Sequence, residues 1–402
     1  MLTVAQARER ILQRISVLGS QDVALIDARG RVLAEDVRSE RDVPPFANSA
    51  MDGYAVRAAD VRTASRSAPV RLRVKGEIRA GSPPPAGVEP QSALRIMTGA
   101  MIPEGADAVV RVEDTSEQDG TVAIQAAVQP GTSLRLAGTD LRRGDLVASV
   151  GRLVTPGLLG VLASAGRVSV RCVRAPRVLL LTTGDELREA GEALGPGQIT
   201  NTNRYTLTAG LAELGVEVID AGVARDQRDD LVARLQSGES DLVLTTGGVS
   251  MGAYDLVRQL LEERGAVDFW EVALRPGKPL LFGNVAGIPL IGLPGNPVSS
   301  LVGFELFVRP ALLKMQGRKD LERPRLPAVT EDELVNPPHL EQYFRGIAWR
   351  DGERVLVKLT GDQGSHVLRS MADANCFIVV GQGTSRVSVG EAVEIIPLAP
   401  IA

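Results

Sequence analysis

One buried strand of this chain ends in a loop with little side-chain bulk and many hydrogen-bond donors. The stretch LVLTTGGVSMGAYDLV covers residues 242–257; after the leucines and valine come Thr245, Thr246, Gly247, Gly248 and Ser250. Glycine lets a ligand approach the backbone, and N–H groups at a helix start favour an anion. The pattern predicts a loop that binds a charged ligand. A tight strand-to-helix turn has the same composition, and Asp255 would then be an ordinary acid near a helix N-terminus.

Two further strands end in loops of the same kind. The loop TTGDEL (182–187) brings Asp185 and Glu186, and the loop GLPGNPVSS (292–300) brings Asn296 into a helix. The carboxyl ends of parallel strands meet at one sheet edge, where ligands bind in open α/β folds. Acidic side chains do not bind a phosphate unaided. They could hold a hard cation such as Mg²⁺ that bridges to phosphate oxygens.

Basic and hydroxyl side chains in two other segments could bind an oxyanion. The turn RPGKPLLFG (275–283) places Arg275 and Lys278 around a stiff Pro-Gly pair, and paired cations suit an oxyanion. An exposed basic turn is the alternative. Near the C-terminus, the residues that fit oxyanion contact are Arg345, Gly364, Ser365, Arg369 and Ser370, whereas His366 fits a structural role equally well.

Three polar loops occur in a region rich in short strands. They are PPFANSAMDGYAV (44–56) with Asn48, Ser49 and Asp52, RIMTGAMIPEGADAVV (95–110) with Thr98 and Gly99, and AGTDLRRGD (137–145) with Asp140. Each loop alone is typical of a turn. Together they indicate a second wall that faces the ligand.

The spacing of apolar residues predicts the elements that position these loops. A helix is expected at 3–18, where Thr3 and Gln6 form a capping box, and another after Thr155. Short strands are expected between about 45 and 135, and a small β-barrel or sandwich after Pro324. Between them, apolar strands at 177–183, 216–222, 241–248 and 288–295 alternate with helices near 203–214, 229–237, 254–264 and 297–315. This alternation predicts a parallel sheet covered by helices, with Pro310 kinking or dividing the last helix.

Composition excludes several classes of protein. The 402 residues suggest two to four domains. A net charge of −4 argues against nucleic-acid binding. Two cysteines and two histidines are too few for a Cys/His zinc site or a disulfide scaffold. No apolar run approaches the ~20 residues of a membrane span, and the N-terminus is a charged amphipathic helix instead of a signal peptide. We therefore expect no membrane partner and a reducing cytoplasm.

Across nearly the full length, the motifs resemble those of the molybdopterin molybdenumtransferase family, which includes the gephyrin E domain. In family order they are NSAMDGYAV, IMTGAMIPEGADAVV, TTGDEL, GQITNTNR, TTGGVSMGAYD, RPGKP, GLPGNPVS and GSHVLRSM…AN. The resemblance implies insertion of molybdate into adenylyl-molybdopterin, with release of AMP and molybdenum cofactor and with Mg²⁺ involved. It also implies a cytoplasmic homodimer whose site lies between subunits. Possible partners are a molybdopterin adenylyltransferase and proteins that mature molybdoenzymes.

The family fold implies a multidomain α/β plus β protein with four parts. They are an elongated dimerisation domain (1–44 and 136–174), an inserted β-domain (45–135), an α/β molybdopterin-binding domain with a mostly parallel sheet (175–318) and a C-terminal β-barrel (319–402). The catalytic residues that the resemblance implies are Asp52, Thr98, Asp140, Glu186, Asp226 and Asp255, of which Glu186, Asp255 and Asp52 would hold the metal. The substrate-binding residues would be Gly247, Gly248, Ser250, Arg275, Lys278, Pro279, Pro294, Asn296, Pro297, Arg345, Ser365 and Ser370.

The chain departs from the family pattern at two places. Arg275 stands where lysine is common, which keeps the charge and changes the geometry. Thr200 and Asn201 replace an aromatic residue and an acid, which affects pterin or nucleotide contacts. No adenylylating domain precedes residue 1, so we expect another protein to supply the substrate. The alternatives are a molybdopterin adenylyltransferase or related nucleotide-processing enzyme, and a non-catalytic scaffold like gephyrin.

Overall fold

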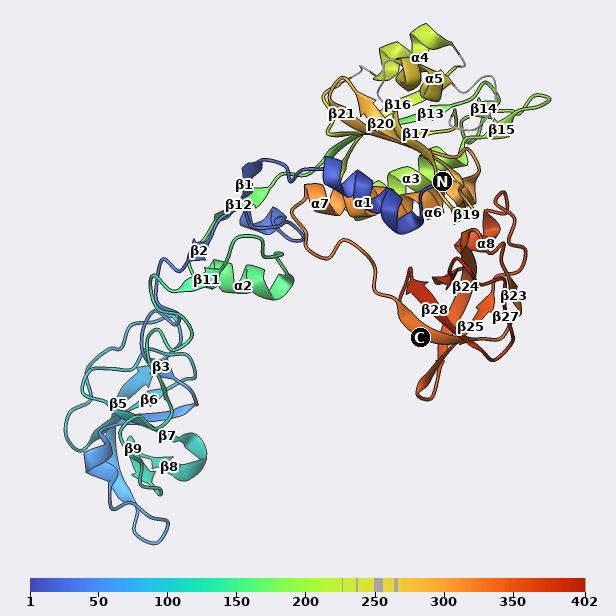
Figure 1. Cartoon of the computed structure of the whole chain (residues 1–402). Helices are drawn as coiled ribbons and strands as arrows, with labels where there is room; N and C mark the ends of the chain where they lie inside the picture. The colour runs from blue at the N-terminus through green and yellow to red at the C-terminus, as the bar shows by residue number, and fades with distance from the viewer. Residues whose placement is uncertain (226, 236–237, 249–255, 264–266, 402) are drawn as a thin grey trace. The chain divides into compact units, whose positions relative to one another are not determined.

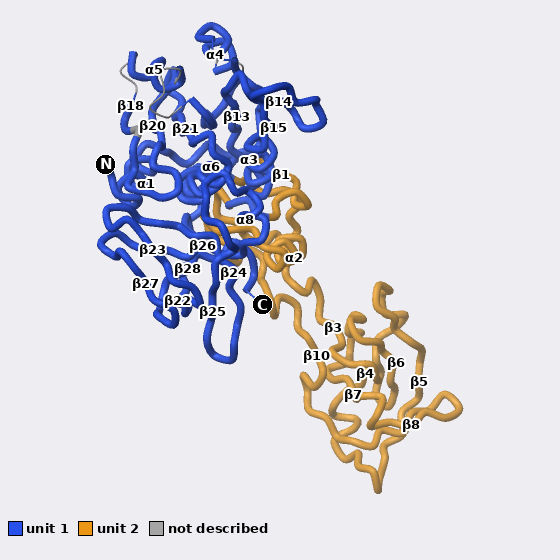
Figure 2. Tube along the Cα trace, turned by 90° about the vertical axis from the view of Figure 1, so that its right-hand side faces the viewer, with its two compact units in different colours: residues 1–21, 30–32, 173–402 blue, residues 22–29, 33–172 orange. Residues whose placement is uncertain are grey.

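The computed structural model describes residues 1–225, 227–235, 238–248, 256–263 and 267–401. The chain forms two compact units (Figure 2), here called unit 1 and unit 2. Unit 1 comprises residues 1–21, 30–32 and 173–402, and unit 2 comprises residues 22–29 and 33–172. The division into four domains stays a prediction. No helix in the described parts is long and apolar enough to cross a membrane.

A six-stranded sheet forms the centre of unit 1, in the order β16-β13-β17-β21-β20-β18. The first four strands run parallel, and β20 and β18 continue the sheet antiparallel. The predicted, mostly parallel sheet is therefore confirmed. The strands are β13 (Arg177–Thr183), β16 (Glu217–Ala224), β17 (Leu242–Thr246), β18 (Val267–Glu271), β20 (Pro279–Val285) and β21 (Ile288–Leu293), and a parallel pair, β14 (Leu187–Arg188) and β15 (Ile199–Thr200), lies apart from the sheet.

Helices cover both faces of this sheet, which explains why its strands are apolar without interruption. Successive residues of β13 point to opposite faces: Val178 and Leu180 join one core cluster, and Leu179 and Leu181 join another. The first face packs against α1 (Val4–Arg14), α3 (Thr202–Glu213), α6 (Pro297–Gly303) and α7 (Arg309–Met315), and the second against α4 (Arg228–Leu235) and α5 (Leu256–Glu263). Figure 1 shows these two layers of helices on either side of the sheet.

Local sequence signals account for the helix boundaries. Thr3 and Gln6 form the predicted capping box at the start of α1. The predicted long helix at 297–315 is divided, because a π-helical segment, η4 (Phe304–Val308), separates α6 from α7. Pro310 has no N–H and its ring crowds the preceding turn, so a widened turn just before it is expected.

A closed barrel of five strands follows in unit 1. Its strands pair in the order β24-β25-β22-β28-β26, and β26 pairs back with β24. Val357, Ile378 and Ile395 fill its interior. The predicted C-terminal barrel is confirmed. Its elements are β22 (Leu326–Thr330), β24 (Glu341–Asp351), β25 (Arg354–Leu359), β26 (Cys376–Val380), β28 (Ala392–Pro397) and α8 (Arg369–Ala372), with the outer pair β23 (Leu334–Val335) and β27 (Arg386–Val387); β19 (Leu274–Arg275) extends β24.

Unit 2 contains a second six-stranded sheet, in the order β7-β4-β6-β5-β9-β8. Tyr54, Leu72 and Val110 pack in one of its cores. The sheet strands are β4 (Gly53–Val56), β5 (Val70–Ile78), β6 (Ser92–Ile96), β7 (Ala108–Arg111), β8 (Thr115–Gln118) and β9 (Thr121–Ile124). The remaining elements are α2 (Pro156–Ser164), the turns η1 (Leu25–Asp27), η2 (Ala58–Val61) and η3 (Val112–Asp114), and the strands β1 (Ser20–Ala24), β2 (Val37–Arg38), β3 (Asn48–Ser49), β10 (Leu134–Arg135), β11 (Leu146–Ala148) and β12 (Ser169–Val173).

Candidate active site

Three loops meet at the carboxyl edge of the unit 1 sheet. They follow the parallel strands β13, β17 and β21, which are direct neighbours. A Cβ built on Gly247 would lie 2.6 Å from the carbonyl oxygen of Thr183, and one on Gly248 would lie 3.0 Å from Thr183 Oγ1. Both glycines have positive φ angles. Glycine is therefore required here first because two loops pack directly against each other.

Asparagine side chains join these loops to α3. Asn203 Nδ2 donates to Thr246 Oγ1 at 2.7 Å and to the carbonyl oxygen of Gly295 at 2.8 Å. Asn201 Nδ2 donates to Thr182 Oγ1 at 2.9 Å, and its side-chain oxygen caps α3. Asn201, a departure from the family pattern, thus has a structural partner. Asn203 lies in the motif GQITNTNR and no role was predicted for it, although a polar residue in the first turn of a helix that packs on the sheet indicates such a contact.

A cavity of about 1080 Å³ opens at this edge, between the sheet loops and the barrel. Residues 182–184, 186–187, 199–203 and 246–248 line one side of it, and residues 340, 342 and 363–366 of the barrel line another. The residues predicted from sequence that line this cavity are Glu186, Gly247, Gly248, Arg275, Lys278, Pro279, Pro294, Asn296, Pro297 and Ser365. Thr200, Asn201 and His366 line it as well, whereas Asp185 is not among its lining residues.

The basic turn supplies the positive charge of the cavity. Lys278 Nζ lies 3.1 Å from Glu271 Oε1, so this ammonium group already has a carboxylate partner. In the described part of the chain, the exposed Arg275 guanidinium has no hydrogen-bond or ion-pair partner. Glu186 is the acidic side chain among the residues that line the cavity. Two cations and one carboxylate therefore surround the space.

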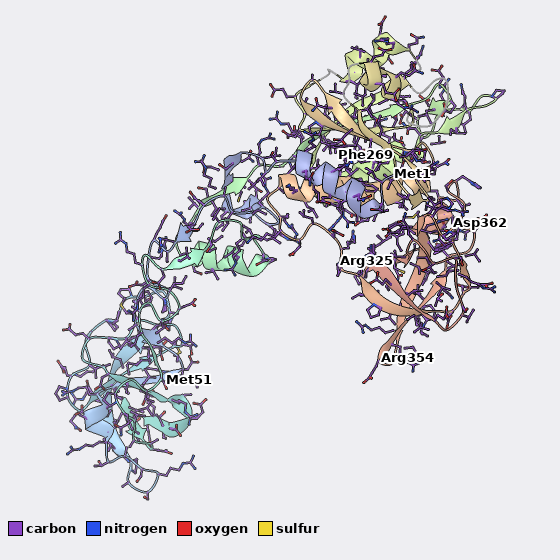
Figure 3. All side chains as sticks on the ribbon, in the orientation of Figure 1. Met1, Met51, Phe269, Arg325, Arg354 and Asp362 are labelled. Carbon is purple, nitrogen blue, oxygen red and sulfur yellow. The ribbon has the colours of Figure 1, made fainter. Side chains whose placement is uncertain are left out.

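The barrel contributes the loop 361–366, which is tied to the sheet loops. Asn296 Nδ2 donates to Ser365 Oγ at 3.0 Å, and the Val298 N–H donates to the Ser365 carbonyl oxygen at 3.2 Å. Asp362 at the start of this loop lies at the end of the barrel nearest the sheet (Figure 3). Ser365 thus lines the same cavity as the basic turn.

Arg345 lies behind this loop, and it does not line the cavity. Its side chain is only 1% exposed. Its Nη2 donates to the carbonyl oxygens of Asp362 at 3.4 Å and Gly364 at 3.1 Å, and its Nε donates to Ser370 Oγ at 3.1 Å. Burial lowers the pKa of Arg345 to about 10. In the described structure, Arg345 and Ser370 hold the wall of the cavity, and their predicted direct contact with substrate stays a prediction.

Buried acceptors beside the cavity lack partners. Asn203 Oδ1 and Gln342 Oε1 are both buried, and neither accepts a hydrogen bond from the residues that the structure describes. Such groups cost free energy, and natural proteins keep few of them. Buried acceptors without partners are expected at sites whose residues serve binding or catalysis and not stability alone. Neither residue was predicted from sequence.

Three predicted residues belong to unit 2. Asp52 Oδ1 accepts hydrogen bonds from the backbone N–H and from Oγ1 of Thr98, each at 2.7 Å. These bonds, the one from the Thr98 hydroxyl first, lower the pKa of Asp52. The loops 44–56 and 95–110 therefore meet at this pair. Asp140 is exposed, and its backbone N–H donates to the Val43 carbonyl oxygen.

Three predicted residues, Asp226, Ser250 and Asp255, lie outside the described residues. Among the described residues, no group of three or more His, Cys, Asp or Glu side chains is placed to hold a metal ion. Mg²⁺ is usually held by one or two carboxylates together with substrate phosphates. Glu186 fits that pattern as a single protein ligand.

Three family models match successive parts of the chain. The model described as "MoeA N-terminal region (domain I and II)" matches residues 2–166. The model described as "Probable molybdopterin binding domain" matches residues 179–314, and that described as "MoeA C-terminal region (domain IV)" matches residues 327–398. The fold and the cavity thus define a protein with a molybdopterin-binding type of α/β domain.

Similar proteins extend this match over the full length. Molybdopterin molybdenumtransferase of Haemophilus influenzae is 40% identical over 99% of this chain and 98% of its own. Molybdopterin molybdenumtransferase 2 of Mycobacterium tuberculosis is 39% identical over 93% and 94%. A crystal structure of the molybdopterin biosynthesis MoeA protein from Pyrococcus horikoshii matches with a TM-score of 0.82 at 33% identity, over 100% of both chains. The chain belongs to the molybdopterin molybdenumtransferase family.

Proposed function

We propose that this protein inserts molybdate into adenylyl-molybdopterin and releases AMP and molybdenum cofactor. Its relatives with the name molybdopterin molybdenumtransferase share nearly its whole length. The observation that carries the proposal is the cavity of unit 1. It combines two cationic side chains, a carboxylate and three glycine-bearing loops at one sheet edge.

The reaction must bring anions together, and the basic turn is suited to that task. Molybdate is a dianion, and the substrate carries a pyrophosphate link. Arg275 and Lys278 would bind molybdate together with the hydroxyl of Ser365, a residue that lines the same cavity. Arg345 would keep the Ser365 loop in place from behind and add its buried charge. Charges that are already in position lower the barrier without reorganisation.

The glycine-bearing loops would hold the pterin phosphate. Gly247 and Gly248 leave the backbone accessible at the end of β17, and Ser250, which follows them in sequence, would add a hydroxyl donor. Pro294, Asn296 and Pro297 would form the adjoining rim. Water would cleave the phosphoanhydride between AMP and the pterin phosphate. The two dithiolene sulfurs would displace one oxygen of molybdate, which leaves as water with the two thiol protons.

Mg²⁺ would share the substrate phosphates with Glu186. When bound, the ion neutralises phosphate charge and so favours the approach of molybdate. Asp255 and Asp52 are the further ligands expected from the family resemblance. Asp226, Asp140 and Thr98 keep their expected catalytic roles as predictions. The residues of unit 1 themselves bind and orient the anions.

A homodimer formed through segments 1–44 and 136–174 is the assembly we infer. Ile26 is 84% exposed and Val168 is 83% exposed. The two are brought close by a backbone hydrogen bond of 2.9 Å from Leu25 to Val168. Two exposed β-branched side chains next to each other favour contact with another surface. Light scattering on Val168→Glu tests the inference, because a mass unchanged from that of a wild-type dimer would contradict it.

The cytoplasm is the location we infer, since the two cysteines are free and buried. Adenylyl-molybdopterin would come from an adenylylating enzyme, which is the expected partner. The deciding experiment mixes the purified protein with adenylyl-molybdopterin, Mg²⁺ and molybdate and follows AMP by chromatography. Molybdate-dependent release is expected. Release that does not depend on molybdate would refute the proposal.

A matched pair of lysine variants connects the activity to the cavity. Lys278→Ala removes a cation that lines the cavity, and Lys75→Ala removes a lysine of unit 2 that pairs with Glu89. We expect Lys278→Ala to weaken the molybdate dependence and Lys75→Ala to leave it unchanged. An unchanged molybdate dependence in Lys278→Ala would contradict the role given to Lys278.

A further inference from the structure

Lys278, one of the two cations that line the cavity, is paired with Glu271, a carboxylate that does not line it. Glu271 Oε1 lies 3.1 Å from Lys278 Nζ, with side chains 24% and 48% exposed respectively. Glu271 is the last residue of β18 and lies opposite Pro279 of β20 in the antiparallel register. The carboxylate therefore reaches Lys278 from the end of β18, and Glu271 is not among the lining residues.

The backbone around this ion pair is fixed independently of it. The Val272 N–H donates to the carbonyl oxygen of Lys278 at 3.0 Å and closes the loop at its base. Leu274 and Arg275 pair with Glu341 and Gln342 of the barrel strand β24. The flexible part is the Lys278 side chain, whose four-carbon stem leaves the ammonium group free to move between partners.

Glu271 changes the charge that an entering anion meets. The basic turn and Glu186 give the lining residues two positive charges and one negative charge, a net +1. When the negative charge of Glu271 is included, the net charge around the cavity is zero. A half-exposed ion pair of this kind contributes little stability, about 0–1 kcal/mol in typical cases. An oxyanion with two charges can therefore displace the carboxylate from Lys278.

We infer that Glu271 is a built-in counter-ion of Lys278 that competes with the oxyanion for the ammonium group and so sets the affinity of the cavity for anions. It is a positioning residue, because it acts through Lys278 and does not touch the ligand. Arg275, which has no partner in the described residues, keeps the cavity attractive to anions while Lys278 is occupied. The inference rests on the proposed function only in that the cavity binds an oxyanion.

Isothermal titration calorimetry with sodium molybdate at fixed ionic strength tests this inference. Glu271→Gln keeps the shape of the side chain and removes its charge. We expect the Kd for molybdate to fall about two- to fivefold, the size of effect typical of one half-exposed ion pair. In the Lys278→Gln background, Glu271→Gln should have no further effect, because the group through which it acts is gone. Glu271→Asp keeps the charge and should keep the Kd within about twofold of the wild-type value.

A matched carboxylate controls for total charge. Glu217, at the opposite end of the sheet on β16, pairs with Arg177 at 3.5 Å. Glu217→Gln should leave the Kd unchanged. An unchanged or raised Kd in Glu271→Gln, an equal fall in Glu217→Gln, or a full effect that persists without Lys278 would each overturn the inference. Absence of molybdate binding in every variant would overturn it too, while AMP release would still decide the proposed function separately.

Discussion

Replacement of Arg345 distinguishes two ways in which this residue could act. The family resemblance predicts direct contact with molybdate, whereas the described bonds of Arg345 are to Asp362, Gly364 and Ser370. If the guanidinium holds the loop, the loop must open more easily without it. If the guanidinium only contacts the ligand, the loop of the free protein must be unaffected.

The size of the effect follows from the charge and its bonds. The lowering of the Arg345 pKa to about 10 corresponds to roughly 3 kcal/mol of unfavourable charge burial. Hydrogen bonds from a charged donor contribute about 1.5–3 kcal/mol each, so three bonds outweigh that cost. We expect Arg345→Lys to lower the opening free energy of the loop by about 1–2 kcal/mol, because one ammonium group cannot replace a planar fork of donors.

Hydrogen exchange followed by mass spectrometry measures this opening. Peptides covering residues 361–371 of Arg345→Lys should exchange about 5- to 30-fold faster than in the wild-type protein, since 1.4 kcal/mol is a factor of ten. Peptides from β5 in unit 2 serve as the internal control and should not change. Molybdate affinity should fall in parallel. Loss of affinity with unchanged exchange in 361–371 would refute the positioning role and favour direct contact.

Three further predictions concern stability and reactivity. Gly53→Ala should destabilise unit 2 by about 1–3 kcal/mol in urea unfolding, because the added Cβ would lie 1.9 Å from the Val110 carbonyl oxygen; equal stability would contradict the close packing of β4 and β7. Burial alone would raise the pKa of Asp241, but hydrogen bonds from Arg174 and from the Arg177 N–H outweigh burial and lower this pKa. Asp241→Asn should therefore lower the free energy of unfolding by about 1–3 kcal/mol, constant above pH 5, and this loss should vanish as the pH falls below about 4. A loss that grows at low pH would contradict this sign. Burial raises the pKa of the Cys376 thiol to about 12, so Ellman's reagent at pH 8 should react with this thiol only after unfolding, and rapid reaction in the native protein would contradict its burial.

The sequence was sufficient for elements whose pattern is local. The apolar run at 177–183 predicts β13 to the residue, and Thr3 with Gln6 predicts the start of α1. These elements follow from residues that are neighbours in the chain. The strand order and the closure of the barrel depend on contacts between distant segments. The antiparallel strands β20 and β18 escaped prediction for that reason, since the basic turn between them was considered only for its charge.

Predicted site residues that lie on the loops themselves are brought together at one cavity, and their roles stay predictions. Glu186, Lys278 and Ser365 were expected from their residue types and line the cavity. A side chain that acts only as the ion-pair partner of a site residue is harder to predict from sequence. Glu271 is the last residue of a strand of ordinary composition, and only the register of β18 against β20 brings it to Lys278. Sequence spacing carries no record of such pairing.

The glycines that opened the sequence argument have a second cause besides ligand approach. Gly247 and Gly248 meet Thr183 so closely that any side chain would separate the loops after β13 and β17. A tight turn and a ligand-binding loop were alternative interpretations of these glycines. In this structure the tight packing of the two loops also gives the ligand access. Because the loops touch, the ends of both strands open into one cavity, and Glu186 shares it with the basic turn. A bulkier residue at position 247 would move the carboxylate away from the cations before it obstructed any ligand.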